Sequence, residues 1–208
     1  MKIPLRQFKL LSIFGLVVVS AALAATAASP ARAASCPPPP TPLQAFAPWA
    51  DLLSYVPVNG GSFPVNGTTA LNQPWTLSSG AALVKDNDPT KLGGLGSFGA
   101  LSLPSGGSAL SQCTTAPMIW PTVRFFVKNM GSTIGSLHVQ VLVNGGKNGI
   151  LDGGFITAGS SWAPSPAITI PWLSPLSGAV NLQVRLTASG TGAQFEVDDI
   201  YLDPCRSR

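Results

Sequence analysis

Two adjacent acids, Asp198 and Asp199, stand in the middle of the last apolar stretch of the chain, residues 194–204. Their carboxylate oxygens are hard ligands of the kind that calcium prefers. A charged group inside a strand is costly unless a cation or several N–H donors pair with it. The acid pair therefore predicts either a structural calcium site or a carboxylate held by the backbone, and the sequence leaves both open.

The apolar residues around this acid pair change phase. Along a strand, successive side chains alternate between the two faces. Phe195 and Val197 share one face, whereas Ile200 and Leu202 lie one residue out of step with them. An extra residue in the strand, a β-bulge near residues 198–199, restores the alternation. We therefore expect a bulge there, with one carboxylate close to the edge of the core.

A second set of polar side chains lies on expected strands at residues 122–127, 137–143 and 180–186, where apolar and polar residues alternate. If these strands are neighbours, their amides, cations and ring form a surface suited to sugars, because sugar hydroxyls pair with planar polar groups and C–H faces stack on rings. With Trp162 from a Pro-rich loop, the candidate ligand-binding residues are Arg124, Phe126, His138, Gln140, Gln183, Arg185 and Trp162. A solvated sheet face without a ligand is the competing interpretation.

The sequence carries little that indicates catalysis. His138 is the only histidine, it lies in mid-strand, and no nucleophile-elbow pattern accompanies the many serines. Glycoside hydrolysis usually needs two carboxylates across a cleft, but Asp198 and Asp199 are adjacent and Glu196 is the only glutamate. Zinc-ligand spacings, a phosphate-binding loop and a dinucleotide fingerprint are absent from the sequence. We therefore predict a non-catalytic protein with no cofactor, apart from the calcium considered above.

The first 33 residues have the pattern of a secretory signal peptide. Basic residues in the first nine positions precede an apolar, Ala-rich run at residues 10–28. The sequence Ala31-Arg32-Ala33 then fits a cleavage site. We exclude this segment from the fold and expect a secreted, extracellular protein, with attachment to the cell surface left open.

Export changes the charge balance of the chain. Of its 12 Lys and Arg residues, four lie in positions 1–33, so that eight basic residues face eight acidic ones in the mature chain. The formal net charge of +4 therefore belongs to the targeting segment. Because a basic stripe and a basic amphipathic helix are both missing, we expect no nucleic-acid partner and no membrane insertion of the mature chain.

Three cysteines, Cys36, Cys113 and Cys205, remain after export. An exported chain favours a disulfide, and an odd number leaves one thiol over. A bond between Cys36 and Cys205 would join the two ends, whereas one between Cys36 and Cys113 would tie the N-terminal arm to a mid-chain loop. The sequence leaves the pairing open.

Short strands must position all of these residues. The mature chain is rich in Gly, Pro, Ser and Thr and shows about nine short alternating segments without a credible long helix. The further expected strands are 75–77, 82–84, 100–103, 150–156 and 167–172. A Pro-rich arm at 34–48 precedes a single domain at 49–205. This pattern predicts an all-β fold, a sandwich of two antiparallel sheets.

Several short motifs carry a resemblance. They are Pro48-Trp49-Ala50-Asp51, Val58-Asn59-Gly60-Gly61-Ser62-Phe63 and the terminal Val197-Asp198-Asp199-Ile200-Tyr201-Leu202-Asp203-Pro204. Together they resemble a family of uncharacterised secreted bacterial β-sandwich proteins. An early Gly-Ser-Phe strand with a late Asp-Asp strand is also similar to jelly-roll, galactose-binding-like carbohydrate-binding modules. The resemblance implies a jelly-roll sandwich whose first and last strands lie close together.

The resemblance also bears on the metal and the function. In many such modules an acid after the Phe of the first strand helps the Asp-Asp strand to hold calcium, whereas here Pro64 stands at that position. Calcium at Asp198 or Asp199 therefore remains a hypothesis, in which the site lacks one of the acidic ligands that such modules have. We expect a secreted, non-catalytic module that binds a polysaccharide or cell-wall component. The alternative is a structural or protein-interaction module of the cell envelope with no small ligand.

Overall fold

The computed structural model describes residues 36–37, 41–63, 65–66, 69–70, 75–90, 99–117, 122–170 and 179–203. The predicted signal peptide at residues 1–33 lies outside the described residues, as do Pro64 and Cys205. The described residues belong to one compact unit, Ser35–Arg208. None of the described helices has the length and apolar character that a membrane span requires.

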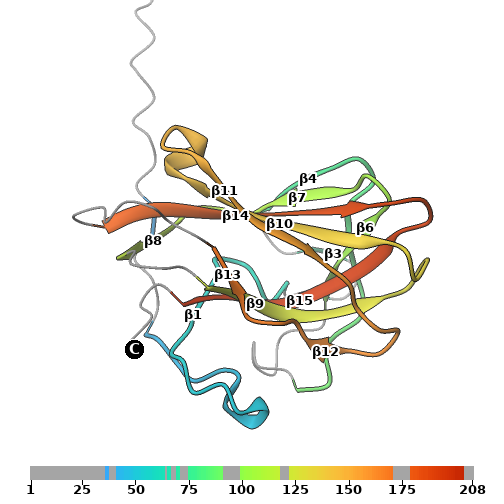
Figure 1. Cartoon of the computed structure of the whole chain (residues 1–208), viewed down its shortest axis with the longest axis horizontal. Helices are drawn as coiled ribbons and strands as arrows, with labels where there is room; N and C mark the ends of the chain where they lie inside the picture. Colours follow the sequence, from blue (N-terminus) through green and yellow to red (C-terminus); the bar gives the residue numbers. More distant parts are fainter. Residues whose placement is uncertain are drawn as a thin grey trace, which may run out of the picture. The chain divides into compact units, whose positions relative to one another are not determined.

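Two antiparallel sheets build this unit (Figure 1). The strands of the first sheet are β1 (Val56–Pro57), β5 (Ala82–Val84), β6 (Ala100–Pro104), β9 (Thr122–Asn129), β12 (Ala163–Pro164), β13 (Ile168–Thr169) and β15 (Gln194–Asp203). The strands of the second sheet are β4 (Thr76–Ser78), β7 (Ser108–Leu110), β8 (Thr114–Pro117), β10 (Ser136–Val143), β11 (Ile150–Ile156) and β14 (Ala179–Ser189). A two-stranded pair, β2 (Val65–Asn66) and β3 (Thr69–Ala70), and two short 3-10 helices, η1 (Ala47–Trp49) and η2 (Asn144–Gly146), complete the described elements.

The chain crosses repeatedly between the sheets. The first sheet has the order β12-β9-β15-β6-β5, with β1 beside β15 and β13 beside β9. The second has the order β11-β10-β14-β7-β4, with β8 beside β14. From β9 the chain passes to β10 and β11 of the second sheet, back to β12 and β13 of the first, then to β14 of the second and β15 of the first. The last strand lies next to the early strand β1. The fold is an all-β, two-sheet antiparallel sandwich of the jelly-roll type, which confirms the fold predicted from the sequence.

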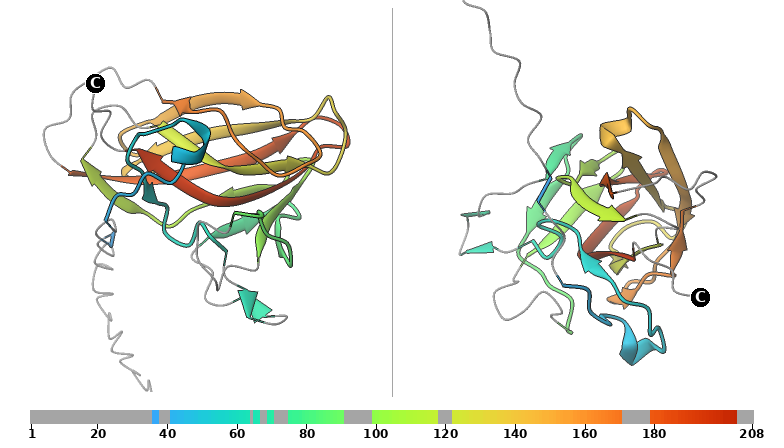
Figure 2. Two further views of the ribbon diagram at one scale, coloured as in Figure 1. Left: turned by 90° about the horizontal axis from the view of Figure 1, so that it is seen from below. Right: turned by 90° about the vertical axis from the view of Figure 1, so that its left-hand side faces the viewer.

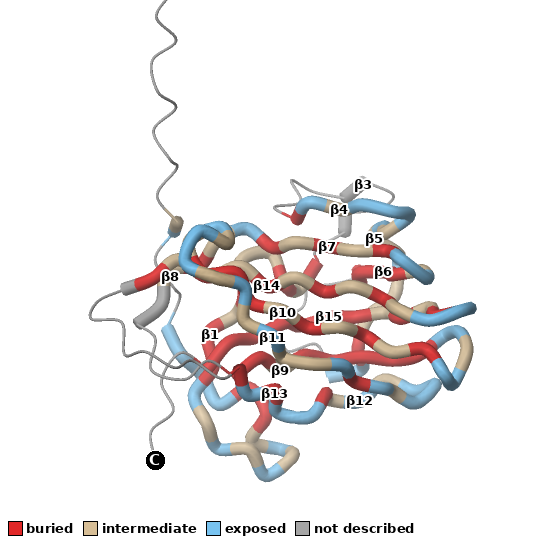
Figure 3. The backbone as a smooth tube through the Cα atoms, turned by 45° about the horizontal axis from the view of Figure 1, so that its top comes forward, coloured by how far each residue is buried: buried red, intermediate tan, exposed pale blue. Residues whose placement is uncertain are grey.

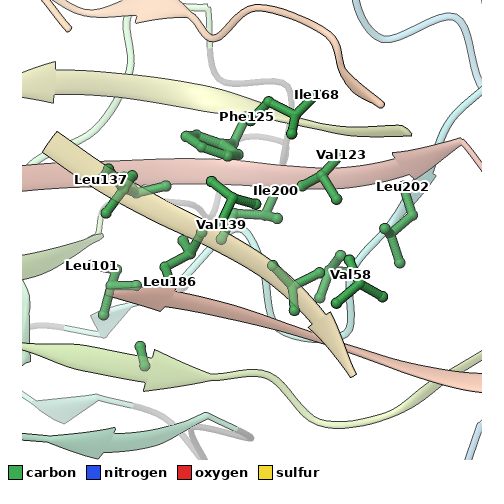
Figure 4. Close-up of a cluster of buried hydrophobic side chains, with 14 of the residues drawn as sticks. Val58, Leu101, Val123, Phe125, Leu137, Val139, Ile168, Leu186, Ile200 and Leu202 are labelled. Atoms are coloured by element: carbon green, nitrogen blue, oxygen red, sulfur yellow. The ribbon is translucent and has the colours of Figure 1, made fainter. Parts of the chain in front are cut away.

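The apolar faces of the two sheets meet in one core. Figure 4 shows side chains of β9, such as Phe125, near Leu137 and Val139 of β10 and Leu186 of β14. Buried residues run through the strands of both sheets, and exposed ones gather at the loops (Figure 3). Each fully buried aliphatic or aromatic side chain contributes roughly 1.5–3 kcal/mol. The core therefore fixes which side chains of every strand point inward and which point to the outer faces.

Strand β15 contains the bulge predicted from the sequence. Its register with β9 shifts between Asp198 and Tyr201, and Asp199 has a φ of 46°. The extra residue lets four apolar side chains reach the core, namely Phe195, Val197, Ile200 and Leu202. The bulge prediction is confirmed, and both acids are buried, because Asp198 is 0% and Asp199 1% exposed.

Residues 43–55, which we call the strap, cover the outer face of the first sheet. The left view of Figure 2 shows this segment, with η1, lying over β9 and β15. The backbones of Leu43 and Tyr55 pair through two hydrogen bonds of 2.8 Å, which closes the strap at its base. Phe46 is fully buried and stacks on Phe126 of β9. The domain boundary expected at residue 49 therefore cuts through a packed segment.

A disulfide fixes the N-terminal arm to the second sheet. It joins Cys36 to Cys113, immediately before β8. The Thr115 hydroxyl donates a hydrogen bond to the Cys36 carbonyl at 3.3 Å. The structure thus selects one of the two pairings that the sequence left open.

Candidate functional site

The outer face of the second sheet presents polar side chains across its strands. Because the inward side chains of β10 and β14 fill the core, their alternate residues point outward. We call this surface the open face; its residues are Ser78, Ser108, Leu110, His138, Gln140, Asp152, Phe155, Gln183, Arg185 and Thr187. All of these are at least partly exposed.

The strand register arranges the open face in two rows that run across the sheet. The first row is Phe155, His138, Thr187, Ser108 and Ser78. The second row is Asp152, Gln140, Arg185 and Leu110. Directly opposite residues of antiparallel strands lie about 4.5–5.5 Å apart. Each row is therefore a continuous path of side chains from one edge of the sheet towards the other.

An exposed ring stands at one end of the first row. Phe155 is 61% exposed and stacks on His138, with ring centroids 4.3 Å apart and planes at 15°. His138 Nε2 lies 2.8 Å from an oxygen of Asp152, which also accepts the Gly154 N–H at 2.8 Å. These two hydrogen bonds hold the pKa of Asp152 below its usual value, the one from Gly154 contributing most. The ring is thus supported from beneath by a fixed imidazole.

A bulge in β11 brings Phe155 and Asp152 to the same face. Val139 pairs with Gly154 and Gln140 with Asp152, so that Gly153 is the extra residue. A Cβ atom on Gly153 would lie 2.6 Å from the Ile170 side chain, so that only glycine fits there without a shift. Neither Phe155 nor Asp152 was among the residues predicted from the sequence, because the Gly153-Gly154 pair interrupts the alternation by which an outward face is recognised.

The centre of the open face carries Arg185. Its guanidinium donates to Gln140 Oε1 at 3.5 Å. The Thr187 and Ser108 hydroxyls beside it share a hydrogen bond of 2.9 Å, and Gln183 is fixed by donating to the Ser111 carbonyl at 2.9 Å. The open face therefore combines a ring, planar amides, a guanidinium and hydroxyls, most of them held in place by neighbours.

The structure brings four of the seven predicted binding residues together. His138, Gln140, Gln183 and Arg185 share the open face because β10 and β14 are neighbours. The other three, Arg124, Phe126 and Trp162, lie at the first sheet. The sequence prediction required β9 to be a neighbour of β10 and β14, but β9 belongs to the other sheet.

At the first sheet, two of the predicted residues, Phe126 and Arg124, contact the strap and hold it in place. Phe126 is 1% exposed beneath Phe46. Arg124 forms an ion pair with Asp51, donates to the Ser165 carbonyl at 3.0 Å and lies 4.6 Å from the centre of the Phe46 ring. A surface hollow of about 550 Å³ beside it is lined by Ala50, Asp51, Leu52, Leu53, Arg124 and Ala167. Since its two charged groups pair with each other, the hollow presents little charge to a ligand.

Three buried acids form a cluster at the bulge of β15. Asp88, Asp198 and Asp199 each offer a carboxylate oxygen, and these oxygens lie within 4.8 Å of one another. Burial, followed by the charge of Asp199 and then that of Asp88, raises the pKa of Asp198 to about 9. The backbone N–H groups of Asp88 and Asp199 donate to Asp198, at 3.4 and 2.8 Å. A bound cation or a proton would further offset the repulsion between three buried carboxylates.

The donor set of this cluster fits calcium. All three ligands are hard oxygens, and calcium takes about six to eight of them, so that backbone carbonyls or water would complete the shell. Asp88, on the segment after β5, supplies a carboxylate that the sequence analysis did not identify. It joins Asp198 and Asp199, the two predicted metal ligands, and the arrangement of the three would hold the ion between the bulge and that segment.

A further ionic cluster lies on the first sheet. The ammonium of Lys128 lies 2.8 Å from a Glu196 oxygen, hydrogen-bonds to Asp86 and stands 5.0 Å from the centre of the Trp162 ring. Burial and the neighbouring Asp86 raise the pKa of Glu196, although Lys128 opposes them. The pKa of Asp86 stays below its usual value because the hydrogen bonds to it outweigh its burial. Trp162 thus packs over an ion pair and is only partly exposed.

Comparison with known proteins finds likeness only among solved structures. No family model and no curated protein sequence matches the chain. A module named TmCBM61, solved with β-1,4-galactotriose, is 17% identical, with a TM-score of 0.40 over 62% of this chain and 87% of the other. The xylan-binding module CBM15 is 11% identical, with a TM-score of 0.45 over 70% and 97%. An arabinose-bound α-L-arabinofuranosidase, MgGH51, is 19% identical, with a TM-score of 0.49 over 74% of this chain and 27% of the enzyme, about a quarter of its length. At these identities and TM-scores the likenesses carry no function over to this chain.

Proposed function

We propose that this protein is a secreted, non-catalytic module that binds a carbohydrate polymer on the open face. The observation that carries the proposal is the exposed Phe155 ring, fixed on His138 at the end of a row of polar side chains. Such a ring offers its free side to the C–H face of a sugar, and the neighbouring amides and hydroxyls suit sugar hydroxyls. The first row crosses four inter-strand steps of about 4.8 Å, a path of roughly 19 Å, which suits a polymer better than a single sugar.

The ionic clusters support a non-catalytic role. At the first sheet, the Lys128 ammonium stands between the carboxylates of Asp86 and Glu196, where a scissile bond would have to lie. At the open face, the hydrogen bond described for the His138 ring joins it to Asp152 rather than to a nucleophile. In both arrangements the ionisable side chains pair with one another, which favours a role in holding neighbouring side chains in place.

Export is part of the proposal. The signal-peptide pattern at residues 1–33 and the disulfide between Cys36 and Cys113 both support it, since structural disulfides persist in oxidising compartments. An exported module would meet polymers outside the cell, either in the medium or in a cell wall, and we propose one of these as its partner.

Retention on insoluble polymers tests the proposal. Protein expressed from the full-length sequence is mixed with insoluble xylan, galactan and isolated cell walls, and bound protein is measured with and without soluble oligosaccharide. We expect retention on a polysaccharide that its own oligosaccharide competes away. Phe155→Ala should weaken this retention about five- to tenfold, because it removes the stacking surface.

A matched variant controls for the loss of an exposed apolar side chain. Ile134, on the loop between β9 and β10, is 79% exposed. Ile134→Ala should leave retention unchanged. Equal retention of Phe155→Ala and the unmodified protein would exclude the open face as the binding surface.

The second candidate function is a protein-interaction module of the cell envelope. Met130 and Ile134, 54% and 79% exposed, put two apolar side chains on one loop, where a protein partner could cover them. Retention on cell walls alone, lost in Ile134→Ala and kept in Phe155→Ala, would favour this alternative over carbohydrate binding.

A further inference from the structure

The centre of the open face holds a positive charge without a matching acid. Across the strands, Arg185 is flanked by Gln140 and Leu110, neither of which is charged. The salt bridges found among the described residues involve other cations. Asp152, the carboxylate of the open face, lies two strands away and is engaged by His138 and Gly154. Among the residues of the open face, therefore, no carboxylate pairs with the positive charge of the Arg185 guanidinium.

The groups around Arg185 are arranged mainly as donors. Because the guanidinium donates to Gln140 Oε1, the amide nitrogen of Gln140 is left to donate elsewhere. The Thr187 and Ser108 hydroxyls share one hydrogen bond, which leaves the proton of the second hydroxyl for another acceptor. A ligand group rich in acceptors and negatively charged would match this centre.

Other cations of the described residues are used differently. Arg124 and Lys128 are ion-paired at the first sheet, where they hold the strap and the Asp86 segment. Lys85 and Lys147 are exposed and lie outside the open face. Arg185 is thus a cation placed by a central strand at the middle of a polar surface, in a planar form that pairs with carboxylates through two parallel hydrogen bonds.

We propose that the open face selects acidic glycans, polymers whose sugars carry carboxylate groups, and that Arg185 binds the carboxylate. This inference rests on the proposed function, carbohydrate binding at the open face. Phe155 and Arg185 come from strands two apart, about 10 Å across the sheet. One part of a polymer can therefore stack on the ring while a carboxylate of another part pairs with the guanidinium.

Matched polymers that differ only in charge test the inference. Polygalacturonate, glucuronoxylan and alginate are each compared with their carboxyl-reduced forms, in which every uronic acid becomes a neutral sugar. Calorimetry on protein from the full-length sequence gives the dissociation constants. We expect at least one acidic polymer to bind about tenfold or more tightly than its reduced form, and added salt should diminish that advantage.

Variants at Arg185 identify the group responsible. Arg185→Gln should weaken binding of the acidic polymer about ten- to a hundredfold and binding of the reduced form much less, so that the two forms bind with similar affinity. Arg185→Lys keeps the charge without the planar fork and should lie between the two. Lys85→Gln removes one positive charge away from the open face and should change neither affinity. Melting temperatures establish that each variant is folded.

The outcomes separate the inference from the proposed function. If acidic and reduced forms bind equally, or if Arg185→Gln weakens both alike, selection for acids is wrong while carbohydrate binding stands. If no polymer binds in either form, both are wrong.

Discussion

At the scale of single residues, Asp198 is a carboxyl group whose negative charge is costly because it is buried beside other acids. Its side chain is 0% exposed, and its pKa is raised to about 9 by burial and by its acidic neighbours. A proton or a cation can satisfy it, but the two compete for the same oxygens. Whichever holds the site therefore determines how stability depends on pH.

Calcium is expected to stabilise the protein. Because an ion that binds only the folded state raises its stability, 1 mM CaCl₂ should raise the melting temperature above that measured in EDTA. The rise should be larger at pH 8 than at pH 5, since protons compete for the carboxylates. Scanning calorimetry at both pH values measures it.

Two variants and one contrary outcome complete this test. Asp88→Asn should abolish the calcium effect, whereas Asp152→Asn, at an exposed carboxylate, should retain it. If calcium leaves the melting temperature unchanged, the calcium site is wrong, and Asp198 with its raised pKa stays protonated near neutral pH. In that case stability falls as the pH rises from about 4 towards 9, because the folded state with its raised pKa binds the extra proton.

At the scale of the elements, the strap is held by a network around one carboxylate. Asp51 accepts the Tyr55 hydroxyl at 2.7 Å and the Leu53 N–H at 3.1 Å, and it forms an ion pair with Arg124. Burial acts to raise the pKa of Asp51, but these hydrogen bonds and the guanidinium outweigh it and hold that pKa below its usual 3.8. The strap is therefore docked by a group that is charged over most of the pH range.

Asp51→Asn should destabilise the protein by about 1–2 kcal/mol at pH 7, because a charge-assisted hydrogen bond is lost. The lowered pKa contributes stability that is present above pH 3.8 and is lost as the pH falls through the folded-state value. The cost of the variant should therefore shrink at pH 3. Urea unfolding of the variant and of the unmodified protein at both pH values measures this. An equal cost at both pH values would contradict the role of the charge.

The elements also mark what the sequence could and could not predict. Alternation predicted β9, β10, β14 and the bulge of β15, because a core between two sheets imposes a period of two on every strand that lines it. The strands β7 and β8 were missed, since Ser108–Leu110 and Thr114–Pro117 are too short to show an alternating pattern. They are strands through their pairing with β14 and, for β7, also with β4.

The candidate site was predicted in part for the same reason. His138, Gln140 and Arg185 are outward residues of alternating strands, so that local period alone identifies them. The assignment of β9 to the opposite sheet depends on pairing with β15, some seventy residues further along the chain, which no local pattern contains. Phe126 was therefore grouped with residues that lie on the other layer.

At the scale of the whole molecule, one covalent bond joins the start of the described chain to its middle. The disulfide between Cys36 and Cys113 spans 77 residues, a segment that includes the strap and the strands β1 to β7. Closing so long a loop restricts the unfolded chain strongly. The bond therefore stabilises a region whose own strands are short.

Replacing both cysteines, Cys36→Ser with Cys113→Ser, should lower the free energy of unfolding by about 2–4 kcal/mol. Urea unfolding under oxidising conditions measures the difference. Cys205→Ser is the matched control and should leave the stability unchanged, because the disulfide does not involve that residue. If the double variant is as stable as the unmodified protein, the disulfide contributes nothing to the free energy of unfolding.

The position of this disulfide has a mechanical consequence. Tension applied upstream of Cys36 enters the sandwich at Cys113, next to β8, and bypasses the whole strap. While the bond is intact, a pull on the arm is carried by a covalent link into the sheet that bears the open face. Once the bond is reduced, the same pull acts first on the hydrogen bonds that Thr115 donates to the carbonyls of Cys36 and Pro37. It then acts on the backbone pairing of Leu43 with Tyr55 at the base of the strap.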